Sequence, residues 1–175
     1  MTEVSTYDKF CIKLDEACKC YEMMKSIISR EYVITDRDHN EILGAGSTIA
    51  ISLAKEFIFE AARAYRICEH SWNLMGINKI DMKIFITSLQ NLIRSRDVNE
   101  HWTDSVNIKQ KSRPQKHKVG EINVDDTSFI IINGNLSFGN LELDKYYRAV
   151  KKMNDLYGWK ARAMKSIVEK KECEI

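Results

Sequence analysis

Two arginines and one histidine lie within two helical turns of one another in residues 92–102: Arg94, Arg96 and His101. An arginine binds a phosphate group through parallel N–H donors. A neutral imidazole accepts a proton near neutral pH. These two kinds of group suffice to cleave RNA by attack of its own 2′-hydroxyl, without a metal ion. The segment is therefore our candidate site, with RNA as the candidate substrate.

Helical geometry leaves open which arginine acts with His101. In an unbroken helix of about 100° per residue, Arg94 and His101 share a face, whereas Arg96 lies about 140° away. A break at residues 95–97 would instead bring Arg96 toward His101. Asp97 follows Arg96 in the sequence and has a carboxylate that can orient an arginine.

A second arginine–histidine pair, Arg63 and His70, has the same seven-residue spacing as Arg94 and His101. Short spacings of this kind arise by chance, so the spacing alone does not identify a site. Arg63 and His70 lie in an alanine-rich segment, where they most simply form a solvated helix face. The candidate stretch differs because it ends an amphipathic segment and precedes Trp102 and a basic segment.

Apolar residues recur at helical spacing in four segments, and this pattern predicts four helices. We place them at residues 6–30, 48–72, 79–104 and 144–171, with Asp144 as the N-cap of the last helix and a kink at Gly158. Residues 128–143 contain two strand-like runs joined by an Asn-Gly turn, which predicts a β-hairpin. The predicted fold class is all-α: a four-helix up-and-down bundle with one β-hairpin inserted before the last helix, in a single domain of residues 1–175.

Two segments lack apolar periodicity and are expected to be loops. Residues 31–40 are polar throughout their second half. Residues 105–120 carry five basic side chains around the only proline of the chain: Lys109, Lys111, Arg113, Lys116 and Lys118. This basic loop is either solvated or a contact surface for the phosphates of RNA.

Composition limits the class of protein. A hydrophobic content of 44% is enough for a core, and a net charge of +2 means that any basic patch must be local. The five cysteines form no C-x-x-C pair and no zinc-ligand spacing with the four histidines, so we expect free thiols, no metal and no cofactor. No segment has the pattern of a signal peptide or a spanning helix, so we expect a cytoplasmic protein without membrane contact.

Residues 96–101, Arg-Asp-Val-Asn-Glu-His, resemble the R-x4-6-H signature of the HEPN superfamily of small helical domains. Asp97 matches the polar residue that typically follows the motif arginine. The resemblance implies a helical bundle that pairs about a two-fold axis. Many members are metal-independent ribonucleases of toxin–antitoxin, abortive-infection and CRISPR-linked systems. One branch has a tyrosine as nucleotidylation target two residues after the histidine, where this chain has Thr103.

The resemblance thus implies a homodimeric endoribonuclease, with a cognate antitoxin or regulatory protein as a further partner. His101 would accept the proton of the 2′-hydroxyl, Arg96 and Arg94 would stabilise the charge on the phosphorane, and Asp97 would orient an arginine. The alternative is a HEPN-like module without chemistry that binds RNA, a nucleotide or a protein partner. A metal hydrolase is disfavoured because the scattered histidines offer no ligand set.

Overall fold

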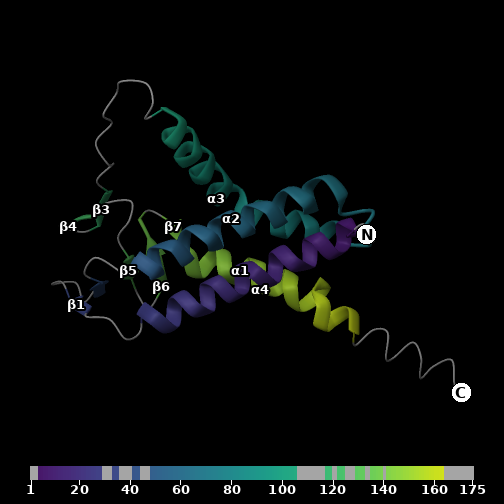
Figure 1. Cartoon of the computed structure of the whole chain (residues 1–175), viewed down its shortest axis with the longest axis horizontal. Coiled ribbons are helices and arrows are strands. Elements are labelled where there is room, and N and C mark those ends of the chain that lie inside the picture. The colour runs from purple at the N-terminus through teal and green to yellow at the C-terminus, as the bar shows by residue number, and fades with distance from the viewer. Residues whose placement is uncertain are drawn as a thin grey trace, which may run out of the picture.

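The computed structural model describes residues 4–28, 33–35, 41–43, 48–105, 117–119, 122–124, 129–132, 135–139 and 141–163. Its long helices are α1 (Thr6–Ile28), α2 (Thr48–Ser71), α3 (Lys79–Ser105) and α4 (Leu143–Tyr157). Successive helices run in opposite directions (Figure 1), and α1 and α3 each pack against both α2 and α4. The predicted four-helix up-and-down bundle is confirmed.

The core of the bundle is formed by the apolar helix faces that the spacing predicted. α1 buries Phe10, Leu14, Cys18, Tyr21, Met24 and Ile28. α2 buries Phe57 and the small residues Ala54, Ala61, Ala62 and Ala64, which let a neighbouring helix approach closely. α3 adds Phe85, Leu89 and Leu92, and α4 adds Val150 and Met153. Burial contributes about 1.5–3 kcal/mol for each of the larger side chains, so these faces hold the bundle together.

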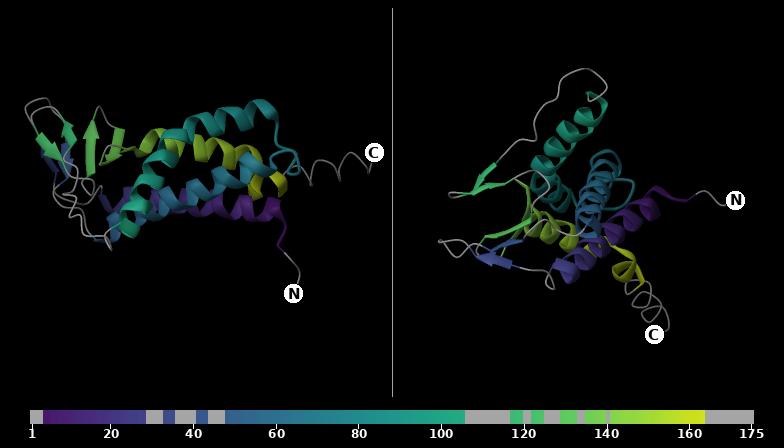
Figure 2. Two further views of the ribbon diagram at one scale, coloured as in Figure 1. Left: turned by 90° about the horizontal axis from the view of Figure 1, so that it is seen from above. Right: turned by 60° about the vertical axis from the view of Figure 1, so that its left-hand side comes forward.

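A five-stranded antiparallel sheet lies at the end of the bundle where α1 ends and α2 and α4 begin (Figures 1 and 2). Its order is β1-β2-β5-β6-β7, with β1 at Val33–Thr35, β2 at Glu41–Leu43, β5 at Phe129–Ile132, β6 at Asn135–Phe138 and β7 at Leu141–Glu142. The predicted hairpin is confirmed as β5 and β6, in which Phe129 lies opposite Phe138. Both phenylalanines are buried, with ring centroids 4.9 Å apart, so the hairpin is fastened to the bundle by its inner face.

Both predicted loops contain short strands, which corrects the prediction. β1 lies within residues 31–40 and pairs with β2, and β2 in turn pairs with β5. β3 (His117–Val119) and β4 (Ile122–Val124) form a separate antiparallel pair, so the basic loop predicted at residues 105–120 is wrong over its last residues. A three-residue strand is too short to show an alternating pattern in the sequence, and its hydrogen bonds come from its partner.

Asp144 is not the N-cap that the sequence predicted. Glu142 occupies the N-cap position of α4 without a side-chain cap hydrogen bond, and Asp144 lies buried within the first turn. The hydroxyl of Tyr21 and the backbone N–H of Leu136 each donate a hydrogen bond to its carboxylate, and Lys25 Nζ lies 3.2 Å from Oδ1. One carboxylate therefore joins α1, β6 and α4.

The predicted kink at Gly158 is an interruption of the last helix. α4 ends at Tyr157, and the N–H of Gly158 donates to the carbonyl of Asn154 over 2.7 Å. Helical backbone resumes at residues 159–163. The rest of the predicted helix, residues 164–171, lies outside the described residues.

Candidate functional site

The predicted catalytic positions all lie on α3. This helix is continuous from Lys79 to Ser105 rather than breaking at residues 95–97. In a continuous helix the Cα positions of Arg94 and His101 share one face, and Arg96 lies about 140° away. The structure therefore favours Arg94 as the arginine on the side of His101, a choice that the sequence left open.

Arg94 is exposed, and its charge lies close to α2. Burial raises the pKa of the Tyr65 phenol, and the hydrogen bond that Tyr65 donates to Glu69 over 3.1 Å raises it further, while Arg94 acts in the opposite direction. Within the described part of the chain, Arg94 makes no hydrogen bond or ion pair of its own.

The other predicted site residues are placed only in part. The backbone of Arg96, Asp97 and His101 forms the far turns of α3, and their side chains lie outside the described part of the structure. The basic residues Lys109, Lys111, Arg113 and Lys116 lie outside the described residues, and only the backbone of Lys118, in β3, is described.

The far turns of α3 lead away from the other three helices (Figures 1 and 2). Among the residues of α3 whose side chains the structure describes, 79–94, Phe85, Leu89 and Leu92 are buried. After Ile93 the only apolar residues of the helix are Val98 and Trp102, one turn apart in the sequence. The segment that carries the arginine–histidine motif is therefore a projection from the bundle and not a component of its described core.

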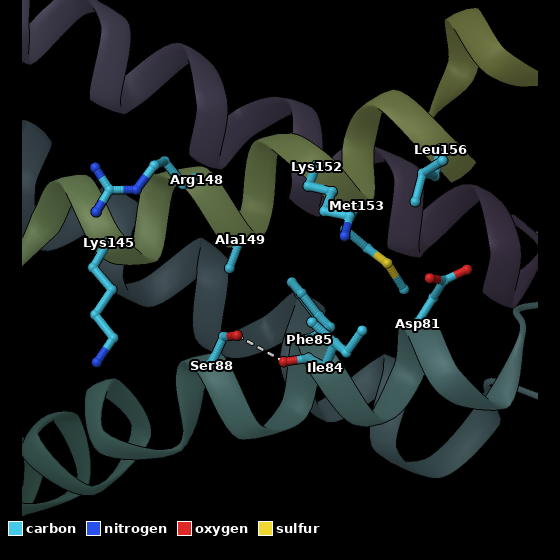
Figure 3. A pocket seen from close by; sticks show the side chains of 10 residues that line it. All are labelled: Asp81, Ile84, Phe85, Ser88, Lys145, Arg148, Ala149, Lys152, Met153 and Leu156. Atoms are coloured by element: carbon cyan, nitrogen blue, oxygen red, sulfur yellow. Dashed lines mark hydrogen bonds between the residues drawn. The ribbon is translucent and has the colours of Figure 1, made fainter.

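An open groove runs between α3 and α4, with a cavity volume of about 230 Å³ (Figure 3). Its floor is apolar and includes Phe85, Ala149 and Met153. The aliphatic side chains of Ile84 on α3 and Leu156 on α4 stand at its edges and are 46% and 42% exposed. The groove thus offers unburied apolar surface to a ligand.

The wall that α4 contributes to this groove is cationic, through Lys145, Arg148 and Lys152. Arg148 is 3.6 Å from Glu142 and donates to Asn135 over 3.4 Å, both outside the groove lining. Lys145 and Lys152 have no ion-pair or hydrogen-bond partner among the residues that the structure describes. The spacing of Lys145, Arg148 and Lys152 places all three on one helix face, a signal in the sequence that the apolar periodicity of the helix does not include.

The groove holds one carboxylate, Asp81, at the end opposite Lys145 (Figure 3). Asp81 accepts a hydrogen bond of 2.7 Å from the hydroxyl of Tyr157, a neutral donor that leaves the carboxylate charged. The hydroxyl of Ser88 donates to the Ile84 carbonyl over 2.7 Å within α3. Among the described residues, no ion pair joins Asp81 to Lys145, Arg148 or Lys152.

The buried carboxylates of the bundle have structural partners instead. Glu60 is 2.9 Å from Lys13 and 2.9 Å from Arg63, which also stacks over the Phe59 ring at 3.9 Å. Arg63 and His70 are both exposed, as we predicted for a solvated face. No group of three or more metal-ligating side chains is found among the described residues.

Comparison with protein-family models, curated proteins and solved structures finds no match. In the part of the chain that the structure describes, none of the helices is both long enough and apolar enough to cross a membrane. The candidate site therefore rests on the chemistry of α3 and of the groove beside it.

Proposed function

We propose that this protein is a metal-independent endoribonuclease of the HEPN type that acts as a homodimer in a toxin–antitoxin or antiphage system. The observation that carries the proposal is the position of the motif. Arg94 is exposed on a continuous helix whose far turns, with His101, project from an up-and-down bundle. A projecting helix can present one arginine–histidine face to a phosphate.

In the proposed reaction the imidazole of His101 takes the proton of the RNA 2′-hydroxyl. The 2′-oxygen forms a bond to the adjacent phosphorus, and the bond from phosphorus to the 5′-oxygen breaks. Arg94 and Arg96 stabilise the negative charge of the phosphorane, with Asp97 orienting an arginine. The leaving 5′-oxygen takes a proton from the histidine of the second copy. The products are a 2′,3′-cyclic phosphate and a 5′-hydroxyl.

The dimer is part of the proposal because a transferring phosphate needs positive charge on more than one side. Two copies related by a two-fold axis would bring two motifs side by side at one RNA-binding surface. Val98 and Trp102 are the two apolar residues that follow Ile93 in the sequence of α3, and in the proposed dimer they would lie in the contact between the two copies. A protein that stays strictly monomeric at micromolar concentration would refute the dimer.

The test is cleavage of RNA in EDTA by His101→Ala and Arg94→Ala. We expect a loss of about 10²–10⁴-fold for the histidine and about 10²–10³-fold for the arginine. Arg63→Ala and His70→Ala are matched controls, since this exposed pair on α2 has the same spacing, and they should keep the wild-type rate. The proposal fails if His101→Ala cleaves as fast as the wild type, or if the products carry a 3′-hydroxyl.

The basic segment would hold the RNA backbone through charge. Replacing Lys109, Lys111, Arg113, Lys116 and Lys118 by alanine should weaken RNA binding and flatten its dependence on salt, because fewer counterions are released. The effect should be nearly the same for RNAs of different sequence. If the salt dependence of RNA binding is unchanged in this variant, the segment does not contact the RNA.

A second candidate is a HEPN-like module without chemistry that binds RNA, a nucleotide or a protein partner. The observation that favours it is the open, cationic groove between α3 and α4, which lies in the well-packed part of the fold. Binding of RNA by the wild type without cleavage under the same conditions would decide for this candidate.

A further inference from the structure

The groove between α3 and α4 has a shape and a charge that the proposed ribonuclease reaction does not use. We propose that it docks an amphipathic helix of a partner polypeptide, with aliphatic residues on one face and carboxylates along one flank. Two antiparallel helices form a groove that a third helix can fill, with its apolar residues recurring every three or four positions.

Exposed aliphatic side chains stand at the α3 edge of the groove and beside Leu156 on α4. Ile84 on α3 and Leu156 on α4 both line the groove and are 46% and 42% exposed. Ile80, one turn before Ile84 and outside the lining, is 67% exposed. A contiguous exposed aliphatic surface favours association, because burying it removes apolar area from water. An incoming helix would cover these side chains together with the floor formed by Ala149 and Met153.

The charged side chains of the groove come from α4. Lys145, Arg148 and Lys152 line one wall of the groove over about two helical turns. Asp81 keeps its negative charge but lies at the opposite end of the groove from Lys145, and no ion pair joins it to the three cations in the described part of the chain (Figure 3). Carboxylates at matching spacing on the flank of a docked helix would complete this wall, and their placement fixes the direction of the helix as well as its affinity.

The composition of the lining favours a protein helix over nucleic acid. Unpaired bases bind to proteins largely by stacking on exposed aromatic rings. The one aromatic residue of the lining, Phe85, is only 2% exposed and belongs to the core. The cations could hold phosphates, but the aliphatic edges would then stay in water.

A second copy of the chain is a poor occupant for the same groove. Two-fold pairing of identical grooves would set Lys145, Arg148 and Lys152 of each copy against the same residues of the other. Like charges facing each other across an interface disfavour that pairing. An acidic partner helix has no such conflict.

The experiment measures the fluorescence anisotropy of a labelled helical peptide of about 20 residues, with leucines at positions i, i+3, i+4 and i+7 and glutamates on one flank. The wild-type protein should bind it saturably, with a Kd well below about 1 mM. The double variant Lys145→Glu and Lys152→Glu should bind about tenfold more weakly and should prefer a peptide with lysines in place of the glutamates. Ile84→Ser should weaken the binding of both the glutamate peptide and the lysine peptide, because it removes apolar surface that either peptide would cover.

The double variant Lys55→Glu and Lys83→Glu is the matched control. Both lysines are exposed and lie outside the groove lining, and their replacement changes the net charge by the same amount as the groove variant does. This control should bind the acidic peptide like the wild type. His101→Ala should also bind it normally, which separates this proposal from the ribonuclease reaction.

Three results would overturn the proposal. The first is the absence of saturable binding, or equal loss in the groove variant and the control. The second is displacement of the peptide by an oligouridylate whose own binding is lost in the groove variant, since the groove would then be a nucleic-acid surface. The third is a dimer that dissociates when Lys145 and Lys152 are reversed, since the groove would then join two copies of this chain.

Discussion

Replacing Asp144 by asparagine should destabilise the protein by about 2 kcal/mol, although the two side chains have nearly the same shape. Asp144 is 7% exposed and accepts hydrogen bonds from Tyr21, from the N–H of Leu136 and from Lys25. An amide has one acceptor oxygen where the carboxylate has two, so one donor must lose its acceptor or turn away.

The magnitude follows from the kind of hydrogen bond that is lost. A bond to a charged group contributes about 1.5–3 kcal/mol and a neutral one about 0.5–1.5 kcal/mol, so each of the two buried bonds loses roughly 1 kcal/mol in the asparagine variant. Lys25 is 56% exposed on its side chain, so solvent screening leaves its ion pair only a few tenths of a kcal/mol. Asp144→Ala leaves both buried donors without an acceptor and should cost about 4 kcal/mol.

The pH dependence gives the prediction a second signature. Burial by itself raises the pKa of Asp144, but the hydrogen bonds from Tyr21, Leu136 and Lys25 outweigh it and hold the pKa below its ordinary value. A carboxyl whose pKa is lowered on folding contributes stability above its unfolded pKa of about 3.9, and that stability is lost as the pH falls through its folded pKa. The difference between wild type and Asp144→Asn should be constant near neutral pH and shrink below about pH 4.

The assay is urea unfolding followed by circular dichroism at several pH values. Asp155→Asn is the control, because this exposed aspartate on the same helix pairs with Lys151 over 2.7 Å and should contribute no more than about 0.5 kcal/mol. A double-mutant cycle of Tyr21→Phe with Asp144→Asn should show coupling between the two side chains. The reasoning is refuted if Asp144→Asn costs no more than Asp155→Asn, or if its effect is unchanged down to pH 2.

Two further predictions concern the turn before α3 and the thiols. Gly76 has a φ of 67°, which favours glycine, so Gly76→Ala should lower the unfolding free energy by about 1 kcal/mol in urea even though nothing lies within 4 Å of the added carbon. Burial raises the pKa of Cys18 to about 11 and of Cys68 to about 12, so at pH 8 both should react with an alkylating reagent far more slowly than a free thiol. Mass spectrometry of labelled peptides should find them modified only after unfolding, and rapid labelling of native Cys68 would contradict its burial.

The helices could be predicted because their pattern is local. The helical spacing of Phe10, Leu14 and Tyr21 gives the buried face of α1 without reference to any other element. The same spacing rule places Ile49 on the apolar face of α2, yet it is 63% exposed. It lies in the first turn of the helix, where periodicity does not say whether a neighbouring element extends far enough to cover it.

The pairing of the β5–β6 hairpin with β2, and the groove, could not be predicted because they depend on long-range neighbours. β2 pairs with β5, which begins almost ninety residues later, and neither strand is long enough to show that pairing. Asp144 looked like an N-cap because aspartate is common there, and only the approach of Tyr21 and Leu136 makes it a buried acceptor instead. The cations of α4 line a groove only because α3 packs opposite them, and the sequence of α4 alone does not show that contact.

The register between α3 and α4 explains why the predicted motif lies where it does. The hydrogen bond from Tyr157 to Asp81 sets the far end of α4 opposite the beginning of α3. The helices are antiparallel with the same rise per residue, so the fourteen residues back from Tyr157 to Leu143 match the fourteen forward from Asp81 to Ser95. α4 can therefore cover α3 only as far as Ser95. Arg96 and His101 lie beyond that point, on turns that the bundle leaves behind (Figure 1). α4 therefore supplies no residue opposite Arg96 and His101, and in the proposed ribonuclease a second copy of the chain would supply the groups that complete the site.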